Sequence, residues 1–300
     1  MTIGTFDGLH VGHWAILDRL AAVASQQGLR PVALAFGLPP RCGLARRSFG
    51  GRCLVLSIDL RAALLASRVR EVQWLRFADV RAVSAETFVR QMLCERLRAR
   101  VVVVGESFRF GRHRAGDVST LRRVAGGRIA IEAVRSEAAD GATVSSSRIR
   151  ALVARGEVAS AAKLLGRSEV LAGRVVRGDR VGRTIGFPTA NIAVASLVVL
   201  PADGVYLAYA YWRGGEGHGM LYVGRRPTIG GATRRVELHL LDAPDAELLG
   251  ERLEVHVVRR LRSEARFAGL DALQAAIARD RDAALEATTR GEVVPTRILG

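Results

Sequence analysis

The sequence has little of several residue types, and each shortage argues against a class of protein. Of its 300 residues only three are cysteines, Cys42, Cys53 and Cys94, and none forms the close pair typical of metal or redox motifs. We therefore expect free thiols rather than bridges. No apolar run reaches the roughly 18 residues of a membrane-spanning helix. The first residues lack a basic start followed by an apolar stretch, which predicts a cytoplasmic protein without a signal peptide.

Lysine is almost absent, because Lys163 is the only one and arginine supplies the rest of the 45 basic residues. Against 29 acidic residues the formal net charge is +16, which suits an anionic partner such as a nucleotide or a nucleic acid. The arginines are spread along both halves and form no single basic stretch. We therefore favour anionic small-molecule substrates over a nucleic acid.

The pattern of the chain changes about half-way. Up to about residue 150, apolar strand-like runs at 31–36, 100–104 and 128–134 alternate with amphipathic helical stretches, which predicts a parallel sheet with crossover helices. From about residue 173 to 262, alternating runs with glycine-rich breaks predict a small antiparallel barrel or sandwich. We predict domains at 1–150 and 169–291, a helical linker at 151–168 and a tail at 292–300. A helix between Leu270 and Ala287 closes the second domain.

The segment 182–191 combines turn-forming glycines with two oxygen donors. Pro188 fixes one backbone angle, so that Thr189 and Asn191 project together. Magnesium prefers oxygen ligands and completes its shell with water and phosphates, so Thr189 and Asn191 predict a Mg²⁺–ATP site. The segment resembles the riboflavin kinase signature. The resemblance implies ATP binding by Gly178, Gly182, Arg183, Gly186, Phe187 and Pro188.

Further segments, 173–178, 201–206 and 226–228, resemble riboflavin kinases in the same order. Glu237 stands alone as a carboxylate in an apolar strand, and the resemblance makes it the general base for the riboflavin hydroxyl. A glutamate on a solvated strand face is the alternative. His239 alternates onto the same face, where we expect a structural role. The resemblance also implies flavin binding by Arg262, Glu264 and Phe267, although a core position would explain Phe267 equally well.

His10 and His13 stand at the start of the first predicted helix, just after a first strand. Backbone N–H groups at a helix start favour anions, and each imidazole can donate a hydrogen bond to a phosphate oxygen. A zinc pair or surface histidines are the alternatives, but no nearby Cys or Glu supplies further ligands at familiar spacing. The positions therefore predict a phosphate site.

The spacing His-x-Gly-His resembles the nucleotidyltransferase superfamily, and segment 4–13 resembles the FMN adenylyltransferase half of bacterial bifunctional riboflavin kinase/FAD synthetases. The resemblance implies catalysis by His10 and His13, and ATP contacts from Gly4, Phe6, Asp7 and Gly8. Segments 103–111 and 144–150 resemble the family's later motifs. They imply a flavin and nucleotide cleft formed by Gly105, Ser107, Phe108, Arg109, Phe110 and Gly111, and phosphate contacts from Ser145, Ser146, Ser147 and Arg148.

Three positions depart from the family pattern. Pro39 replaces the histidine of a Pro-His-Pro loop, Ser107 replaces Asp or Asn, and Tyr222 stands where Asn is frequent. The first two remove a phosphate contact and shorten a polar side chain in the adenylyltransferase half. They keep open a riboflavin kinase whose adenylyltransferase half is degenerate.

The resemblance covers nearly the whole chain. It implies a Rossmann-like α/β nucleotidyltransferase domain followed by a six-stranded antiparallel β-barrel with a terminal helix. It further implies an enzyme that converts riboflavin to FMN and FMN to FAD, with ATP as co-substrate and Mg²⁺ as cofactor, and a homo-oligomer is compatible with it. A flavin-responsive or nucleic-acid-binding protein on the same fold is the alternative outside enzymes.

Overall fold

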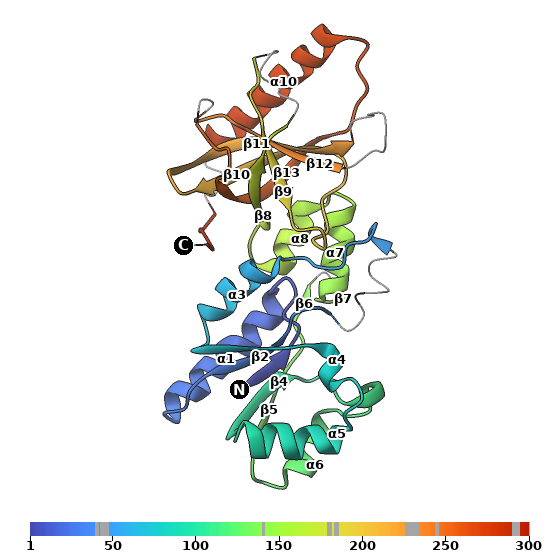
Figure 1. The fold of residues 1–300 in the computed structure, drawn as a ribbon, viewed down its shortest axis with the longest axis vertical. Coiled ribbons are helices and arrows are strands. Elements are labelled where there is room, and N and C mark those ends of the chain that lie inside the picture. The colour runs from blue at the N-terminus through green and yellow to red at the C-terminus, as the bar shows by residue number, and fades with distance from the viewer. Residues whose placement is uncertain are drawn as a thin grey trace. The chain divides into compact units, whose positions relative to one another are not determined.

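The computed structural model describes residues 1–39, 42, 48–139, 142–178, 182, 186–225, 234–243, 246–289 and 295–299. The chain forms two compact units (Figure 1). The first contains Met1–Ala45 and Ile58–Ser146, and the second contains Arg46–Ser57 and Ser147–Gly300. No described helix is long and apolar enough to cross a membrane.

A five-stranded parallel sheet forms the centre of the first unit, with the strand order β3-β2-β1-β4-β5. The strands are β1 (Thr2–Gly4), β2 (Val32–Phe36), β3 (Glu71–Leu75), β4 (Val101–Gly105) and β5 (Ala130–Val134). From β1 the chain adds β2 and β3 on one side of the sheet, and it then adds β4 and β5 on the other side of β1. In such sheets ligands bind at the carboxyl ends of the strands where the winding reverses, which here is between β1 and β4.

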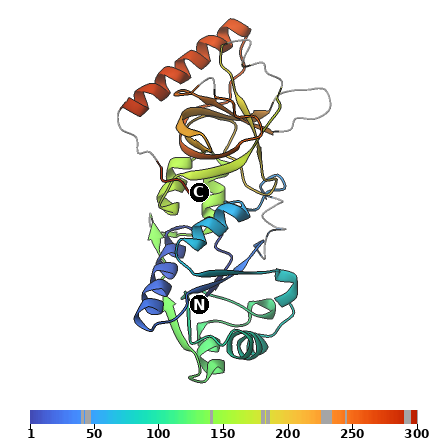
Figure 2. The ribbon, with the colours of Figure 1, turned by 60° about the vertical axis from the view of Figure 1, so that its left-hand side comes forward.

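Helices cover both faces of this sheet (Figure 2). The helices of this unit are α1 (Val11–Gln26), α3 (Ile58–Ala66), α4 (Phe77–Val80), α5 (Ala85–Thr87) and α6 (Val118–Ala125). The unit also contains a π-helical segment η1 (Phe88–Arg96) and a 3₁₀ turn η2 (Arg112–Arg114). A small hairpin is formed by β6 (Ala138–Ala139) and β7 (Ala142–Thr143). Ser84 caps α5, because its Oγ accepts the Thr87 N–H at 3.1 Å. Leu97 N–H donates to Met92 O, five residues back, as expected at the end of the π-helical segment η1.

The second unit contains a closed six-stranded antiparallel barrel of strand order β10-β11-β12-β9-β8-β13. Its strands are β8 (Glu169–Val176), β9 (Ala190–Val194), β10 (Gly204–Trp212), β11 (Gly215–Arg225), β12 (Arg234–Leu240) and β13 (Arg252–Ser263). Helix α10 (Leu270–Thr289) packs on its outside, where Ala284 and Ala287 contact Val205, Leu207 and Met220. The predicted barrel and terminal helix are thus confirmed.

Two helices precede the barrel, α7 (Ser146–Ala154) and α8 (Val158–Leu165). Helix α8 packs against β8 and β13, so it belongs to the second unit. The same unit takes in residues 46–57 from early in the chain. Leu54 forms an isolated parallel bridge with Val198, and Arg52 Nη1 donates to Val198 O at 2.6 Å. These long-range contacts have no signature in the sequence pattern, and the predicted domain limits stay a prediction.

The expectation of free thiols is wrong for two of the three cysteines. Cys42 and Cys53 are disulfide-bonded, whereas Cys94 carries a free thiol. Spacing along the chain gave no indication of this, because a bridge depends on how the chain folds back in space.

Part of the C-terminal tail is anchored to the barrel by one buried carboxylate. Glu254 is 2% exposed, and its two oxygens accept the N–H groups of Ile298 and Leu299 at 2.7 and 2.6 Å. His256 Nε2 lies 2.7 Å from the same carboxylate. Burial raises the pKa of Glu254, but these hydrogen bonds outweigh it and hold the pKa below its usual 4.5.

We predict that Glu254→Gln lowers the unfolding free energy of the second unit by about 1–3 kcal/mol at pH 7, because the amide cannot accept both tail N–H groups and leaves a buried group without its partner. A group whose pKa is lower in the folded than in the unfolded protein stabilises the folded state at pH values above its unfolded pKa. The difference from wild type should therefore shrink as the pH falls below about 4.5. Calorimetric unfolding at several pH values measures it. Glu251→Gln is the control, and equal stability of wild type and Glu254→Gln at pH 7 would contradict the anchoring role.

Candidate functional site

The loop after β1 adopts an unusual backbone path. Phe6 and Leu9 have φ values of +50° and +41°, a left-handed region that costs energy for side chains of this kind. A Cβ at Gly4 would lie 3.1 Å from the Phe6 ring, so glycine lets that ring fold back over the end of the strand. Both Phe6 and Leu9 are buried. The loop is therefore held in one shape at the start of α1.

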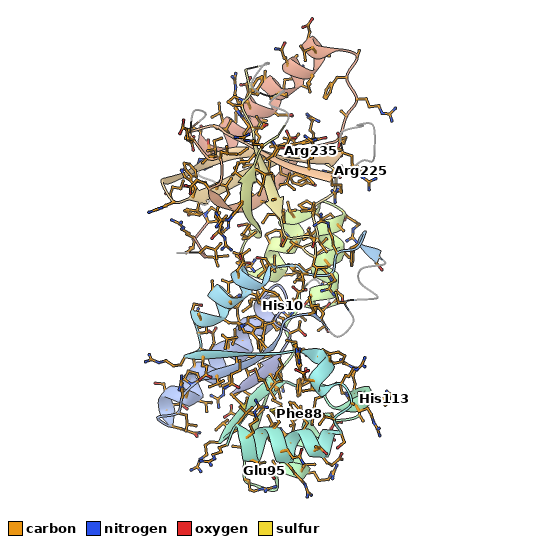
Figure 3. All side chains as sticks on the ribbon, in the orientation of Figure 1. His10, Phe88, Glu95, His113, Arg225 and Arg235 are labelled. Atoms are coloured by element: carbon orange, nitrogen blue, oxygen red, sulfur yellow. The ribbon has the colours of Figure 1, made fainter. Side chains whose placement is uncertain are left out.

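The side chains of His10 and His13 pack against each other at the start of α1 (Figure 3 labels His10). Their rings stack with centroids 3.7 Å apart and planes inclined by 20°, and the Phe6 ring meets His13 edge-on at 5.3 Å. A Cβ at Gly12 would lie 3.4 Å from the His10 ring, which explains a small residue between them. Within the described residues, the buried Nδ1 atoms of His10 and His13 have no hydrogen-bond partner. Such atoms suit a water or a substrate oxygen.

Both histidines are neutral at physiological pH. Burial lowers the pKa of His10 to about 4. Burial also lowers the pKa of His13 well below 6.5, and the neighbouring His10 and Arg61 add to the effect. A neutral imidazole presents one N–H donor and one acceptor. The pair can therefore donate hydrogen bonds to phosphate without accumulating two positive charges.

The second predicted motif begins where β4 ends, beside β1 at the point where the winding reverses. Ser107 and Arg109 are exposed there, and Arg109 pairs with Asp117 at 3.2 Å. Phe108 stacks on Phe110, which is 8% exposed and belongs to the core of the unit. A Cβ at Gly111 would lie 2.7 Å from the Ala85 backbone. Phe110 and Gly111 thus have packing roles, whereas Gly105, Ser107 and Arg109 remain candidates for the cleft.

The serine motif is connected to the loop after β1. Ser146 Oγ donates to the backbone oxygen of Asp7 at 2.8 Å, and Asp7 itself is 1% exposed. Ser147 Oγ accepts a hydrogen bond from Arg150 Nη2 at 2.9 Å. Ser145 and Arg148 are half-buried. Ser146 therefore holds the loop after β1 through its backbone. Phosphate contacts from Ser145, Ser147 and Arg148 stay a prediction.

Sequence reasoning missed one residue of this site, Arg61 of α3. Its side chain is fully buried, and its guanidinium donates to the backbone oxygens of Thr5, Phe36 and Gly37. The available signal was a single arginine in the otherwise apolar stretch 60–66. A buried charge of this kind requires partners, which the pattern alone does not reveal.

In the barrel, the predicted base and metal ligands come together. Asn191 of β9 pairs in register with Glu237 of β12 on one side and with Val176 of β8 on the other. Thr189 Oγ1 lies 3.4 Å from Glu237 Oε2. Glu237 is 3% exposed, so the alternative of a solvated outward glutamate is wrong. Three oxygen donors, two on neighbouring strands and one just before β9, thus share one place on the barrel.

Two glycines give this cluster its close packing. A Cβ at Gly178 would lie 2.1 Å from the Asn191 amide nitrogen, and one at Gly182 would lie 2.3 Å from Phe187 O. Phe187 N–H donates back to Gly182 O at 2.8 Å, which closes the loop before β9. Any side chain at Gly178 would displace the Asn191 amide. Arg183 and the segment 226–228 lie outside the described residues.

His239 has a structural role, as its position suggested. Its Nδ1 lies 2.8 Å from Pro188 O, a contact in which the ring N–H donates, and its ring meets Phe187 edge-on at 5.6 Å. The histidine therefore holds the loop that carries Thr189 against β12. Arg225 and Arg235 are near the ends of β11 and β12 (Figure 3). They add positive charge to this part of the barrel.

The predicted flavin segment is tied to protein partners. Arg262 forms a two-pronged pair with Asp280 of α10, at 2.8 to 2.9 Å, and stacks over the Phe267 ring at 5.4 Å. Glu264 accepts the Tyr222 hydroxyl at 2.7 Å, and a Cβ at Gly224 would collide with both side chains. These contacts fix α10 beside the barrel. Flavin contacts from Arg262, Glu264 and Phe267 stay a prediction.

Comparison with known proteins agrees with this two-site arrangement. Residues 1–148 match the family described as FAD synthetase, and residues 165–288 match riboflavin kinase. The bifunctional riboflavin kinase/FMN adenylyltransferase of Escherichia coli K12 is 36% identical over 95% of this chain and 91% of its own length. The chain belongs to this bifunctional family.

Other members and a solved structure are also similar. The Bacillus subtilis bifunctional enzyme is 29% identical over 95% of the chain and 91% of its own length. A crystal structure described as a macrolide-efflux protein from Streptococcus pneumoniae is 27% identical, with a TM-score of 0.85 over 95% of this chain and 93% of that one. The adenylyltransferase unit and the kinase barrel described above are thus the two parts of one family architecture.

In the adenylyltransferase unit, we predict that His10→Gln flattens the dependence of stability on pH. Because the folded pKa of His10 is about 4, the unfolded chain binds more protons below about 6.5, and wild-type stability falls as the pH drops toward 4. Glutamine does not titrate, so it removes this contribution. Unfolding is followed by the fluorescence of Trp14 and Trp74 in a Trp212→Phe background. Unchanged pH dependence in His10→Gln would contradict the neutral buried state.

In the kinase barrel, we predict that Gly178→Ala reduces riboflavin kinase activity by at least about tenfold, because the new methyl group displaces Asn191. FMN adenylylation should stay within about twofold of wild type, since Gly178 is in the other unit. Gly269→Ala is the control for glycine replacement in the second unit, because nothing surrounds the added carbon there and the backbone lies outside the left-handed region. Kinase activity equal to wild type would show that the close packing on Asn191 is dispensable.

Proposed function

We propose that the barrel transfers the γ-phosphoryl group of ATP to riboflavin, and that the α/β unit transfers AMP from a second ATP to the FMN so formed. Membership of the bifunctional family supports both steps. The observation that carries the residue assignment is the pairing of Asn191 with Glu237 on adjacent strands, with Thr189 next to Glu237 and no competing side chain at Gly178.

In the kinase step, Glu237 accepts the proton of the ribityl 5′-hydroxyl as its oxygen attacks the γ-phosphorus, and ADP leaves. A carboxylate buried between strands is held in one orientation for this transfer. His239 keeps the loop with Thr189 against the same strand. Positioning and charge neutralisation supply most of the catalysis in phosphoryl transfer.

Mg²⁺ fits this place, because Thr189 and Asn191 provide a hydroxyl and an amide oxygen next to a carboxylate. When bound with ATP, Mg²⁺ neutralises phosphate charge. Among the described residues no group of three His, Cys, Asp or Glu side chains is arranged to hold a metal alone. A magnesium site here therefore depends on nucleotide oxygens to complete it.

In the adenylyl step, a phosphate oxygen of FMN attacks the α-phosphorus of ATP, and pyrophosphate leaves. The neutral pair His10 and His13 donates hydrogen bonds to phosphate oxygens, beside the backbone N–H groups at the start of α1. Phe6 and Leu9 fix the loop that presents this pair. We further infer a cytoplasmic enzyme that takes small-molecule substrates, and a homo-oligomeric state stays compatible with this assignment.

The central test is a pair of variants assayed in full-length protein. Glu237→Gln should lower FMN formation from riboflavin by about 10²- to 10⁴-fold, the usual contribution of a general base, and leave FMN adenylylation measurable. His10→Ala combined with His13→Ala should do the reverse, with adenylylation reduced by about 10²- to 10³-fold. Incubation with riboflavin or FMN, ATP and MgCl₂, followed by chromatography with fluorescence detection, separates the flavins.

The controls are matched in residue type, and the carboxylate control is matched in burial as well. Glu254→Gln removes another buried carboxylate of the same barrel, and His113→Ala removes a histidine of the first unit far along the chain from α1. Equal loss of both steps in either test variant would contradict two independent sites. FMN without FAD from the wild-type chain would instead favour a kinase with a degenerate adenylyltransferase half, as Pro39 and Ser107 allow.

A further inference from the structure

Arg61 connects two strand ends of the parallel sheet at the edge where the histidines lie. Its side chain is 0% exposed on α3, yet it carries a guanidinium group. Nη1 donates to Thr5 O at 2.7 Å and to Phe36 O at 3.0 Å, and Nη2 donates to Gly37 O at 2.5 Å. The same group lies 5.2 Å from the centre of the Trp74 ring. One planar cation thus binds three backbone oxygens, one from the end of β2 and two from the loops after β1 and β2.

The three oxygens have a defined place in the chain. Thr5 directly follows β1 and precedes the loop that leads to His10, while Phe36 and Gly37 end β2 and begin the loop that leads to Pro39. Both loops leave the carboxyl edge of the sheet, where ligands bind in folds of this type. A planar guanidinium can serve several acceptors in fixed directions, which a flexible ammonium cannot do.

A purely stabilising role is a poor explanation for this residue. Burial lowers the pKa of Arg61, an effect only partly offset by the Asp7 carboxylate, so its charge is kept at a cost in free energy. An apolar side chain would fill a helix position against a sheet at lower cost. What an apolar side chain cannot do is hold three carbonyl groups and place a positive charge near His13.

We propose that Arg61 is a positioning residue for FMN adenylylation, which fixes the loop after β1 relative to the loop after β2 so that His10 and His13 meet the phosphates in one arrangement. The proposal rests on the proposed adenylyl-transfer function of this unit. Arg61 acts on the reaction through the backbone of Thr5, Phe36 and Gly37 and through its charge beside His13. A small misplacement of such loops is enough to slow a reaction about 10²-fold.

The experiment compares Arg61→Met, Arg61→Lys and Arg68→Met in the full-length chain. Arg68 is a matched control from the same region, because it stacks on Trp14 at 5.3 Å and pairs with Asp18 at 2.9 Å but reaches neither strand end. We expect Arg61→Met to lower kcat for FAD formation from FMN about 10²-fold. Riboflavin kinase activity of the same preparation and both activities of Arg68→Met should stay within about twofold of wild type.

The pH profile separates positioning from folding. The charged and titratable groups that act on His13 are His10 and Arg61, and Asp7 in turn acts on Arg61. Loss of the cation in Arg61→Met should raise the pKa of His13 and move the acid limb of the kcat profile to higher pH. Arg61→Lys keeps the cation, so its acid limb should stay in place while kcat remains reduced, because an ammonium does not reproduce the planar contacts.

Each outcome decides the proposal. Wild-type kcat and an unmoved acid limb in Arg61→Met overturn it. Loss of kinase and adenylyltransferase activities together in Arg61→Met also overturns it, since Arg61 would then serve the fold alone. A wild-type chain that makes no FAD from FMN rejects the proposed adenylyl-transfer function and this inference with it. Reduced kcat with a shifted acid limb in Arg61→Met, and an unshifted one in Arg61→Lys, supports it.

Discussion

The position of β1 at the centre of a parallel sheet is the constraint on which the adenylyltransferase unit depends. Since β1 lies between β2 and β4, its carboxyl end is next to the ends of both neighbours. The loops that carry His10, Pro39 and Ser107 therefore leave one edge of the sheet although they are far apart in sequence. Loops at such an edge lack ladder hydrogen bonds, so their shape has to be fixed by side chains such as Ser146, which donates to Asp7 O.

In the kinase barrel, the candidate functional side chains are positioned by close contact between strands. Asn191 is held between β8 and β12 in the regular ladder, so its position follows from the barrel itself. The loop before it packs so tightly that Gly178 and Gly182 have no room for a Cβ. In one unit the functional groups are positioned by buried hydrogen bonds to loops, and in the other by strand register and the absence of side chains.

Much of the fold could be predicted from the sequence because periodicity reports burial directly. The strands predicted at 31–36 and 100–104 and the helix from residue 270 were found closely, since apolar residues there form clear runs or repeat with a clear period. The π-helical turn at 88–96, the bridge between Leu54 and Val198 and the disulfide-bonded state of Cys42 and Cys53 were missed. These features depend on contacts between distant segments, which no local pattern contains.

For the site, motifs identified the candidate catalytic and binding residues but not the residues that hold their loops in place. His10, Glu237 and Asn191 stand in recognisable strings of residues, whereas Arg61 is one arginine in a chain full of arginine. Its role follows only from complete burial and three carbonyl partners. A buried arginine loses hydration that only well-placed acceptors can replace, so its burial is tolerated only where the backbone presents such acceptors. In this sheet, the backbone does so at the carboxyl edge, where the candidate site lies.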